Sequence, residues 1–256
     1  MRRPLIRRVA PLLLEFALGA CQGQPAVLLQ DPNQILAATA TSAAAATSVH
    51  IDLSADGRVA LDPFGTGAGT PIDLEGTTAA ADIDLSTGKT RATFAAPGLL
   101  GLAGEAIVVE DGAYLKSTLT GPKFRLTPLA RPAEAPLKGI TDLLARTDLA
   151  PVKGADVPCA GGTCYTVTIE LTPDELAGLV TGVEIPTGLP IPLPDVSAAT
   201  VDLTLLVEQV STRLAGVTAA LDLGDTGDLT IEATFTRWNE PVSIAAPPAD
   251  QVEGAG

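Results

Sequence analysis

The most regular feature of the chain is an alternation of apolar and polar residues that begins near residue 49. Val49, Ile51 and Leu53 alternate there with polar neighbours. A period of two places one set of side chains on a buried sheet face and the other in water. The pattern predicts a large, strongly curved antiparallel sheet of about ten strands. Further strands are expected at residues 72–75, 82–85, 90–95, 107–110, 113–119, 165–171, 201–208, 217–223 and 229–235, with a last short one at 242–246.

Helical signals occur at three places, one before this pattern and two within it. The run Asp31-Pro32-Asn33-Gln34 offers an N-cap acceptor, a proline at the first helical position and a capping-box residue, so a helix is predicted to about residue 47. Residues 140–146 are apolar at helical spacing. The run Thr172-Pro173-Asp174-Glu175 repeats the capping-box pattern before 176–181. The chain is therefore expected to be α+β, with one domain over residues 31–248 and a flexible tail at 249–256.

The first twenty residues resemble a secretory signal. Four arginines precede a short apolar stretch at residues 9–18, which is too short to span a membrane comfortably. The following run Leu18-Gly19-Ala20-Cys21 resembles the lipobox of bacterial lipoproteins, in which the cysteine thiol accepts a diacylglyceryl group as a thioether. We therefore expect a signal at 1–20, lipidation at Cys21 and a tether over 21–30. The alternative is an ordinary signal peptide with a chance cysteine.

The two other cysteines, Cys159 and Cys164, enclose two glycines. In an exported chain this spacing favours a structural disulfide that staples a hairpin. A redox site typically has the closer C-x-x-C spacing, and a metal site needs more ligands than this chain offers.

The composition argues against several classes of function. The chain has 16 basic and 30 acidic residues, a net charge of −14, so it lacks the basic surface that binds nucleic acid. A single histidine, His50, lies at a polar strand position and is interpreted as a surface residue. The carboxylates Asp73, Glu75, Asp82 and Asp84 could bind calcium, although a solvated acidic face explains them more simply. No motif of a hydrolase, phosphate-binding loop or zinc protease is present, and we expect no enzyme, cofactor or metal.

The order of these features resembles the LppX/LprG-type family of actinobacterial cell-envelope lipoproteins, which share their architecture with the LolA/LolB carriers. A lipobox and an alanine-rich helix lead into SVHIDLSADG, followed by the hairpin AIVVEDGAYLKS and the ending FTRWNEPVSIAAPPADQV. The resemblance covers roughly residues 31–248. It implies a half-barrel whose helices pack on the concave face around an apolar cavity for the acyl chains of a lipid or glycolipid.

On this basis we expect a lipid-anchored protein on the extracytoplasmic side of the cell membrane, which carries or presents lipid and could work with an envelope lipid exporter. Only 3% of residues are aromatic, which is compatible with a hollow interior. The alternative is a surface lipoprotein that acts as a structural or interaction module with a filled core; a lipoprotein hydrolase is a weaker one. The cavity candidates, for each of which ordinary core packing is an equal interpretation, are Ile35, Leu36, Leu53, Ile83, Leu85, Phe94, Val108, Leu143, Leu144, Val167, Ile169, Leu203, Leu205, Ile231 and Phe235.

A proline-rich stretch at residues 182–197 is unusually apolar for a loop. Leu189, Ile191 and Leu193 lie between its prolines. Our hypothesis is that this loop borders the cavity mouth and touches membrane or ligand. The alternative is a linker that packs on the sheet.

Overall fold

The structure, a computed structural model, describes residues 28–61, 69–110, 112–127, 138–173, 175 and 199–253. Several expected features lie outside these residues: the signal, Cys21, most of the tether, the helix at 176–181, the loop with Leu189, Ile191 and Leu193, and residues 254–256. They stay predictions. Among the described residues, no helix combines the length and apolar character needed to cross a membrane.

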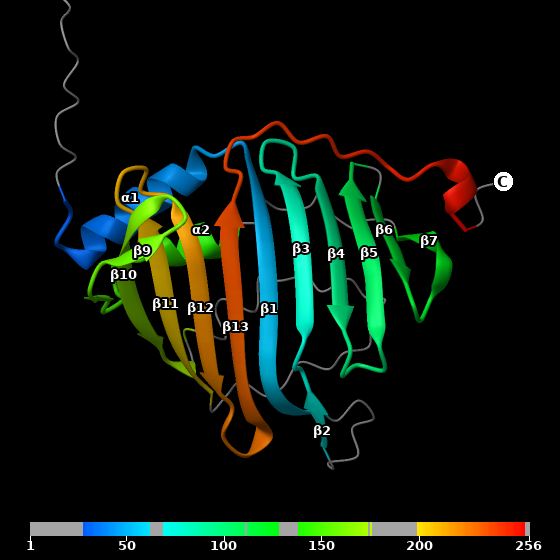
Figure 1. Cartoon of the computed structure of the whole chain (residues 1–256), viewed down its shortest axis with the longest axis horizontal. Helices are drawn as coiled ribbons and strands as arrows, with labels where there is room; N and C mark the ends of the chain where they lie inside the picture. Colours follow the sequence, from blue (N-terminus) through cyan, green and yellow to red (C-terminus); the bar gives the residue numbers. More distant parts are fainter. Residues whose placement is uncertain are drawn as a thin grey trace, which may run out of the picture.

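One antiparallel sheet of 13 strands dominates the fold (Figure 1), and it curves without closing into a barrel. Its strand order is β7-β6-β5-β4-β3-β1-β13-β12-β11-β10-β8, with β2 beside β1 and β9 beside β10. The predicted fold class is confirmed. The strands are β1 (Ser48–Leu61), β2 (Thr70–Asp73), β3 (Thr77–Asp84), β4 (Thr90–Ala96), β5 (Leu102–Val109), β6 (Gly112–Ser117), β7 (Gly121–Thr127), β8 (Val152–Lys153), β9 (Val157–Cys159), β10 (Gly162–Leu171), β11 (Thr200–Glu208), β12 (Leu214–Asp222) and β13 (Gly227–Thr236).

Two helices lie behind the sheet in Figure 1, on its concave face: α1 (Pro32–Ala44) and α2 (Lys138–Leu144). Helix α1 begins as predicted, because the side chain of Asp31 accepts a hydrogen bond from the backbone N–H of Asn33 at 2.9 Å. It ends three residues before the expected position, since β1 begins at Ser48. Two short 3₁₀ turns, η1 (Gly224–Thr226) and η2 (Ala249–Gln251), complete the described elements.

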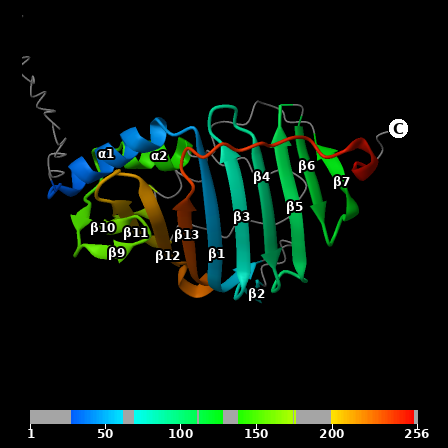
Figure 2. The same cartoon turned by 45° about the horizontal axis from the view of Figure 1, so that its top comes forward.

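The packed core lies at the helix-covered end of the sheet. Ile35 and Leu36 of α1 meet Leu143 and Leu144 of α2 over the buried side chains of β10 and β11. These side chains are almost fully inaccessible, as expected where helices cover alternating apolar strand positions. Figure 2 shows both helices over this end, while the strands from β3 to β7 extend beyond them.

The C-terminal segment after β13 differs from the prediction. Residues 242–246, expected as a strand, form no regular structure because prolines on both sides limit backbone pairing. The segment instead crosses the top of the sheet and ends beside β7 (Figures 1 and 2). There the backbone N–H of Glu253 donates to the carbonyl of Phe124 at 2.8 Å, and Val252 enters a small cluster with Ile107, Val109 and Phe124.

The disulfide between Cys159 and Cys164 is present and links β9 to β10. Gly162 adopts a φ of 119° in the turn between the two cysteines, a conformation that glycine favours. The predicted hairpin staple is therefore confirmed.

Candidate functional site

The concave face carries an apolar surface that continues from the packed core over β1 and β3–β6. Strand pairing places its side chains in three rows across these strands. The middle row is Ile51, Ala81, Ala92, Ala106 and Leu115. The two neighbouring rows are Val49-Ile83-Thr90-Val108-Ala113 and Leu53-Ala79-Phe94-Gly104-Ser117.

The side chains of these rows are less buried farther from the helices. Val49 and Ile83 belong to the packed core, whereas all five side chains of the middle row are partly exposed. Strand spacing makes the rows about 20 Å long and the set about 14 Å wide. Most of its residues are alanine, valine or leucine, and none is charged. We refer to these three rows as the apolar shelf.

Phe94 provides the largest side chain of the shelf. Its ring lies against Gly104 of the paired strand, since a Cβ atom at Gly104 would come within 2.6 Å of the Phe94 ring. The same Cβ would meet the backbone carbonyl of Lys116 at 2.3 Å. Glycine at this position therefore allows the ring to lie low over the sheet and keeps the shelf flat.

The sequence-predicted cavity residues fall into two groups. Those in the packed core are almost inaccessible, which is also the environment of an ordinary core residue. The others are partly exposed, and Leu53, Phe94 and Val108 of this group belong to the shelf, as does the buried Ile83. The core group comprises Ile35, Leu36, Ile83, Leu143, Leu144, Val167, Ile169, Leu203, Leu205 and Phe235, and the partly exposed group comprises Leu53, Leu85, Phe94, Val108 and Ile231.

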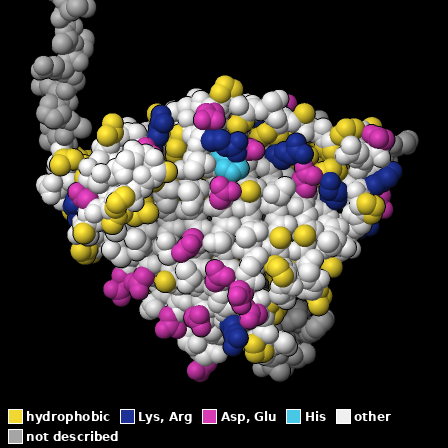
Figure 3. Space-filling model, viewed as in Figure 1, with side chains coloured by type: hydrophobic (Ala, Val, Ile, Leu, Met, Phe, Trp, Pro, Cys, Tyr) yellow, Lys and Arg dark blue, Asp and Glu magenta, His cyan; other side chains and the backbone are white. Residues whose placement is uncertain are grey.

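The opposite face is polar and holds the only histidine of the chain. Figure 3 views this face, with basic side chains in its upper part and acidic ones gathered lower down. His50 Nδ1 lies 2.8 Å from Asp82 Oδ1, and its Nε2 lies 3.3 Å from Asp52 Oδ1. Arg237 also contacts His50 and donates to Asp82 at 2.9 Å. These contacts form an ion-pair cluster on a solvated face, and no described group of side chains provides a metal-binding set.

A second cluster on this face centres on Glu105. Arg91 and Lys116 approach its carboxylate at 2.6 Å and 3.1 Å. Burial acts to raise the pKa of Glu105, but hydrogen bonds from Lys116 and Arg91 outweigh it and hold the pKa below its usual value. Glu105 is therefore ionised at neutral pH and neutralised locally.

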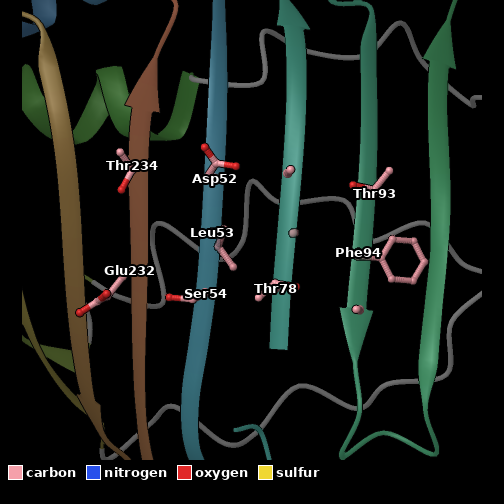
Figure 4. Close-up of a pocket in the computed structure, with 11 residues that line it drawn as sticks. Asp52, Leu53, Ser54, Thr78, Thr93, Phe94, Glu232 and Thr234 are labelled. Atoms are coloured by element: carbon pink, nitrogen blue, oxygen red, sulfur yellow. The ribbon is translucent and has the colours of Figure 1, made fainter. Parts of the chain in front are cut away.

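A hollow of about 550 Å³ lies on the polar face over β13, β1, β3 and β4 (Figure 4). Asp52, Glu232 and several hydroxyl side chains surround it, and Ala80 and Ala95 leave it room. Leu53 and Phe94 also line this hollow, at the strands that form its floor. Their side chains point to the concave face, because successive side chains of a strand alternate between the two faces. Carboxylates and hydroxyls do not suit an acyl chain. The apolar shelf is therefore the better candidate for lipid.

Comparison with solved structures supports this architecture. No protein-family model and no curated protein sequence matches the chain. LprF from Mycobacterium bovis superposes with a TM-score of 0.55 at 15% sequence identity, covering 86% of this chain and 98% of LprF. The chain has the LprF fold. The Mycobacterium tuberculosis lipoprotein LppX is also similar, with a TM-score of 0.49, 17% identity, and coverage of 84% of this chain and 98% of LppX.

Within the LprF fold of this chain, the alanines of the shelf are the residues that sequence reasoning missed. Ala92 lies between Arg91 and Thr93, whereas Ala79 and Ala106 have a polar residue only before them. A period of two still places all three on the apolar face. These alanines were not among the cavity candidates, which are all large apolar residues. Their clustering depends on strand register, which joins residues far apart in the chain.

Proposed function

We propose that this chain is a membrane-anchored lipoprotein that binds the acyl chains of a lipid or glycolipid and carries or presents them in the cell envelope. The observation that carries the proposal is the apolar shelf, a partly exposed surface of small side chains on the concave face. The LprF fold and the lipobox at Cys21 support it. An envelope lipid exporter is a partner that this role would use.

The physical requirement for such a carrier is modest. An acyl chain that leaves a bilayer for an apolar surface exchanges one dry environment for another, so the net free energy of transfer is small and transfer is reversible. Alanine and glycine in paired positions of the shelf present small side chains to such a chain. This role involves no bond making or breaking.

The test is to fill the shelf and measure the lipid that remains bound. Ala92→Phe places a large side chain in the middle row, where Ala92 lies between Ala81 and Ala106. The matched control is Ala95→Phe, three positions along the same strand on the polar face. Native mass spectrometry and organic extraction of the purified proteins should show bound lipid in the parent and in Ala95→Phe, and a severalfold loss in Ala92→Phe.

Two outcomes would contradict the proposal. An absence of lipid from the parent chain would instead favour a structural or interaction module with a filled core. Equal lipid in both variants would remove the shelf as the binding surface. Thermal unfolding of both variants separates loss of lipid from loss of the fold.

A further inference from the structure

Two hairpin turns at one end of the sheet expose leucine side chains to solvent. They are the β4–β5 turn at residues 97–101 and the β6–β7 turn at residues 118–120, which lie at the lower right of Figure 1. Leu100 is 90% exposed and Leu119 is 59% exposed. Neither turn contains a charged residue. We call these two turns the leucine tips.

The leucine tips are fixed to one another and to the sheet. The backbone N–H of Thr118 donates to the carbonyl of Ala103 at 2.8 Å, and its hydroxyl donates to the carbonyl of Gly101 at 3.1 Å. Gly98 lies against β2, since a Cβ atom there would come within 1.6 Å of the Asp73 carbonyl oxygen. The two leucines are therefore held out together by ordered turns.

Leu100 occupies this position at an energetic cost. Its φ is 56°, in the left-handed region that leucine rarely adopts, and glycine or asparagine would fit the turn better. Among the described residues, no buried contact of Leu100 offsets this strain, because the side chain is almost fully exposed. A strained and exposed apolar residue indicates a surface that is used for contact.

The size and chemistry of the leucine tips favour a lipid bilayer over a protein as the contacting surface. Two leucine side chains bury roughly 100 Å² each, far below the roughly 800 Å² per partner of a stable protein interface. A bilayer accepts isolated apolar side chains without matching their shape, and uncharged turns enter it without desolvating an ion. We propose that the leucine tips insert into the bilayer and form a membrane contact separate from the lipid anchor.

This contact fits the proposed function. It depends on that function only in requiring that the protein lies next to a membrane. The tips connect strands β4 to β7, and the shelf occupies β4, β5 and β6 among its strands. Helix α1 lies at the other end of the sheet (Figure 1). Just before this helix, the backbone N–H of Leu29 donates to the hydroxyl of Tyr165 in β10. The tips would bring the shelf end of the molecule to the lipid surface.

The experiment uses residues 21–256 with Cys21→Ser, so that neither the expected signal nor the lipid anchor masks weaker binding, and phosphatidylcholine vesicles as the probe. The test variant combines Leu100→Asn, which suits the left-handed backbone, with Leu119→Ser. The matched control is Val210→Ser in the β11–β12 turn, where Val210 is 84% exposed. In cosedimentation, we expect the test variant to partition onto vesicles about tenfold more weakly than the parent chain. The control should partition as strongly as the parent chain.

Insertion itself has a direct readout. Leu100→Trp should show a blue-shifted emission with vesicles and quenching by brominated lipid, whereas Val210→Trp should show neither. Undiminished binding of the double variant, equal loss in the Val210→Ser control, or a parent chain that does not bind vesicles would each overturn the inference. Bound cargo is measured separately: a chain without lipid whose vesicle binding depends on the tips would refute the carrier function and leave this contact standing.

Discussion

Leu100 shows how one residue can be locally unfavourable within a regular fold. Its φ of 56° contrasts with the glycines at other tight turns, such as Gly88 at 73° and Gly224 at 60°. Glycine has no Cβ and adopts this region freely, whereas an L side chain costs about 1–2 kcal/mol there. The sequence pattern Gly-Leu-Leu-Gly predicts a turn at this place, but it does not indicate which residue adopts the left-handed conformation.

Replacing Leu100 with glycine should therefore stabilise the protein. We expect Leu100→Gly to raise the free energy of unfolding by about 0.5–1 kcal/mol, because relief of strain exceeds the added entropy of the unfolded chain. Leu99→Gly is the control, since Leu99 is partly buried and its φ is negative; it should lower that free energy. Urea denaturation measures both. If Leu100→Gly were less stable than the parent chain, the Leu100 side chain would make a stabilising contact despite its high exposure.

At the scale of elements, the alternation of polar and apolar residues predicts most strands because each has one wet and one dry face. Strand β7 was missed: Pro122 and two basic residues obscure its period, and its only buried side chain is Phe124. The short strand β8 was also missed, and β9 was expected only as one arm of the disulfide hairpin, since two or three residues carry no measurable period.

The capping-box prediction at residue 172 is confirmed by side-chain contacts. The backbone N–H and the hydroxyl of Thr172 each donate to Glu175 Oε2 at 2.8 Å. Arg146, just after α2, bonds to Glu175 at 3.1 Å and to both carboxylate oxygens of Asp148. One arginine thus joins the end of α2 to the start of the next predicted helix.

This junction should respond to acid. The Arg146 hydrogen bond lowers the pKa of Asp148 to about 2, and hydrogen bonds from Thr172 lower the pKa of Glu175. Because both folded-state values lie below the unfolded ones, the stabilisation is complete above about pH 4.5 and is lost as the pH falls toward 2.

Arg146→Gln should therefore flatten the loss of Tm between pH 5 and pH 2 relative to the parent chain. The effect should be small, since these groups are exposed to solvent. Arg58→Gln is the control: Arg58 pairs with Asp73 on the strand pair β1–β2, at 3.6 Å. Circular dichroism melts across this pH range measure the difference. If Tm fell equally with pH in the parent chain and in Arg146→Gln, the Arg146 contacts would not be a source of the acid sensitivity.

At the scale of the whole molecule, the fold class could be predicted from the sequence, but the division of the concave face could not. Val167 and Val108 occupy similar positions in similar strand patterns, yet one is buried in the packed core and the other is partly exposed on the shelf. Their difference depends on where α1 and α2 lie along the sheet. That placement follows from long-range packing, which a local period of two does not contain.

An open sheet leaves two edge strands whose unpaired backbone groups can join another chain. The C-terminal segment covers part of one of these edges. Val252 forms a parallel bridge to Phe124 of β7, and Arg125 donates to Glu253 at 2.6 Å. The backbone bond from Glu253 to Phe124 occupies a carbonyl on the edge of β7. The last described residues thus protect the edge farthest from the helices.

Val252→Asp should release this protection, because Val252 is only 8% exposed and a carboxylate cannot stay in its apolar cluster. We expect amide hydrogen exchange in β7 to accelerate at least tenfold, while β11 in the packed core keeps its protection. The exposed edge should also promote concentration-dependent association, which light scattering detects. Val210→Asp, at an exposed position far from β7, should change neither quantity. If β7 exchanged as slowly in Val252→Asp as in the parent chain, its stability would come from β6 alone and the C-terminal segment would have no protective role.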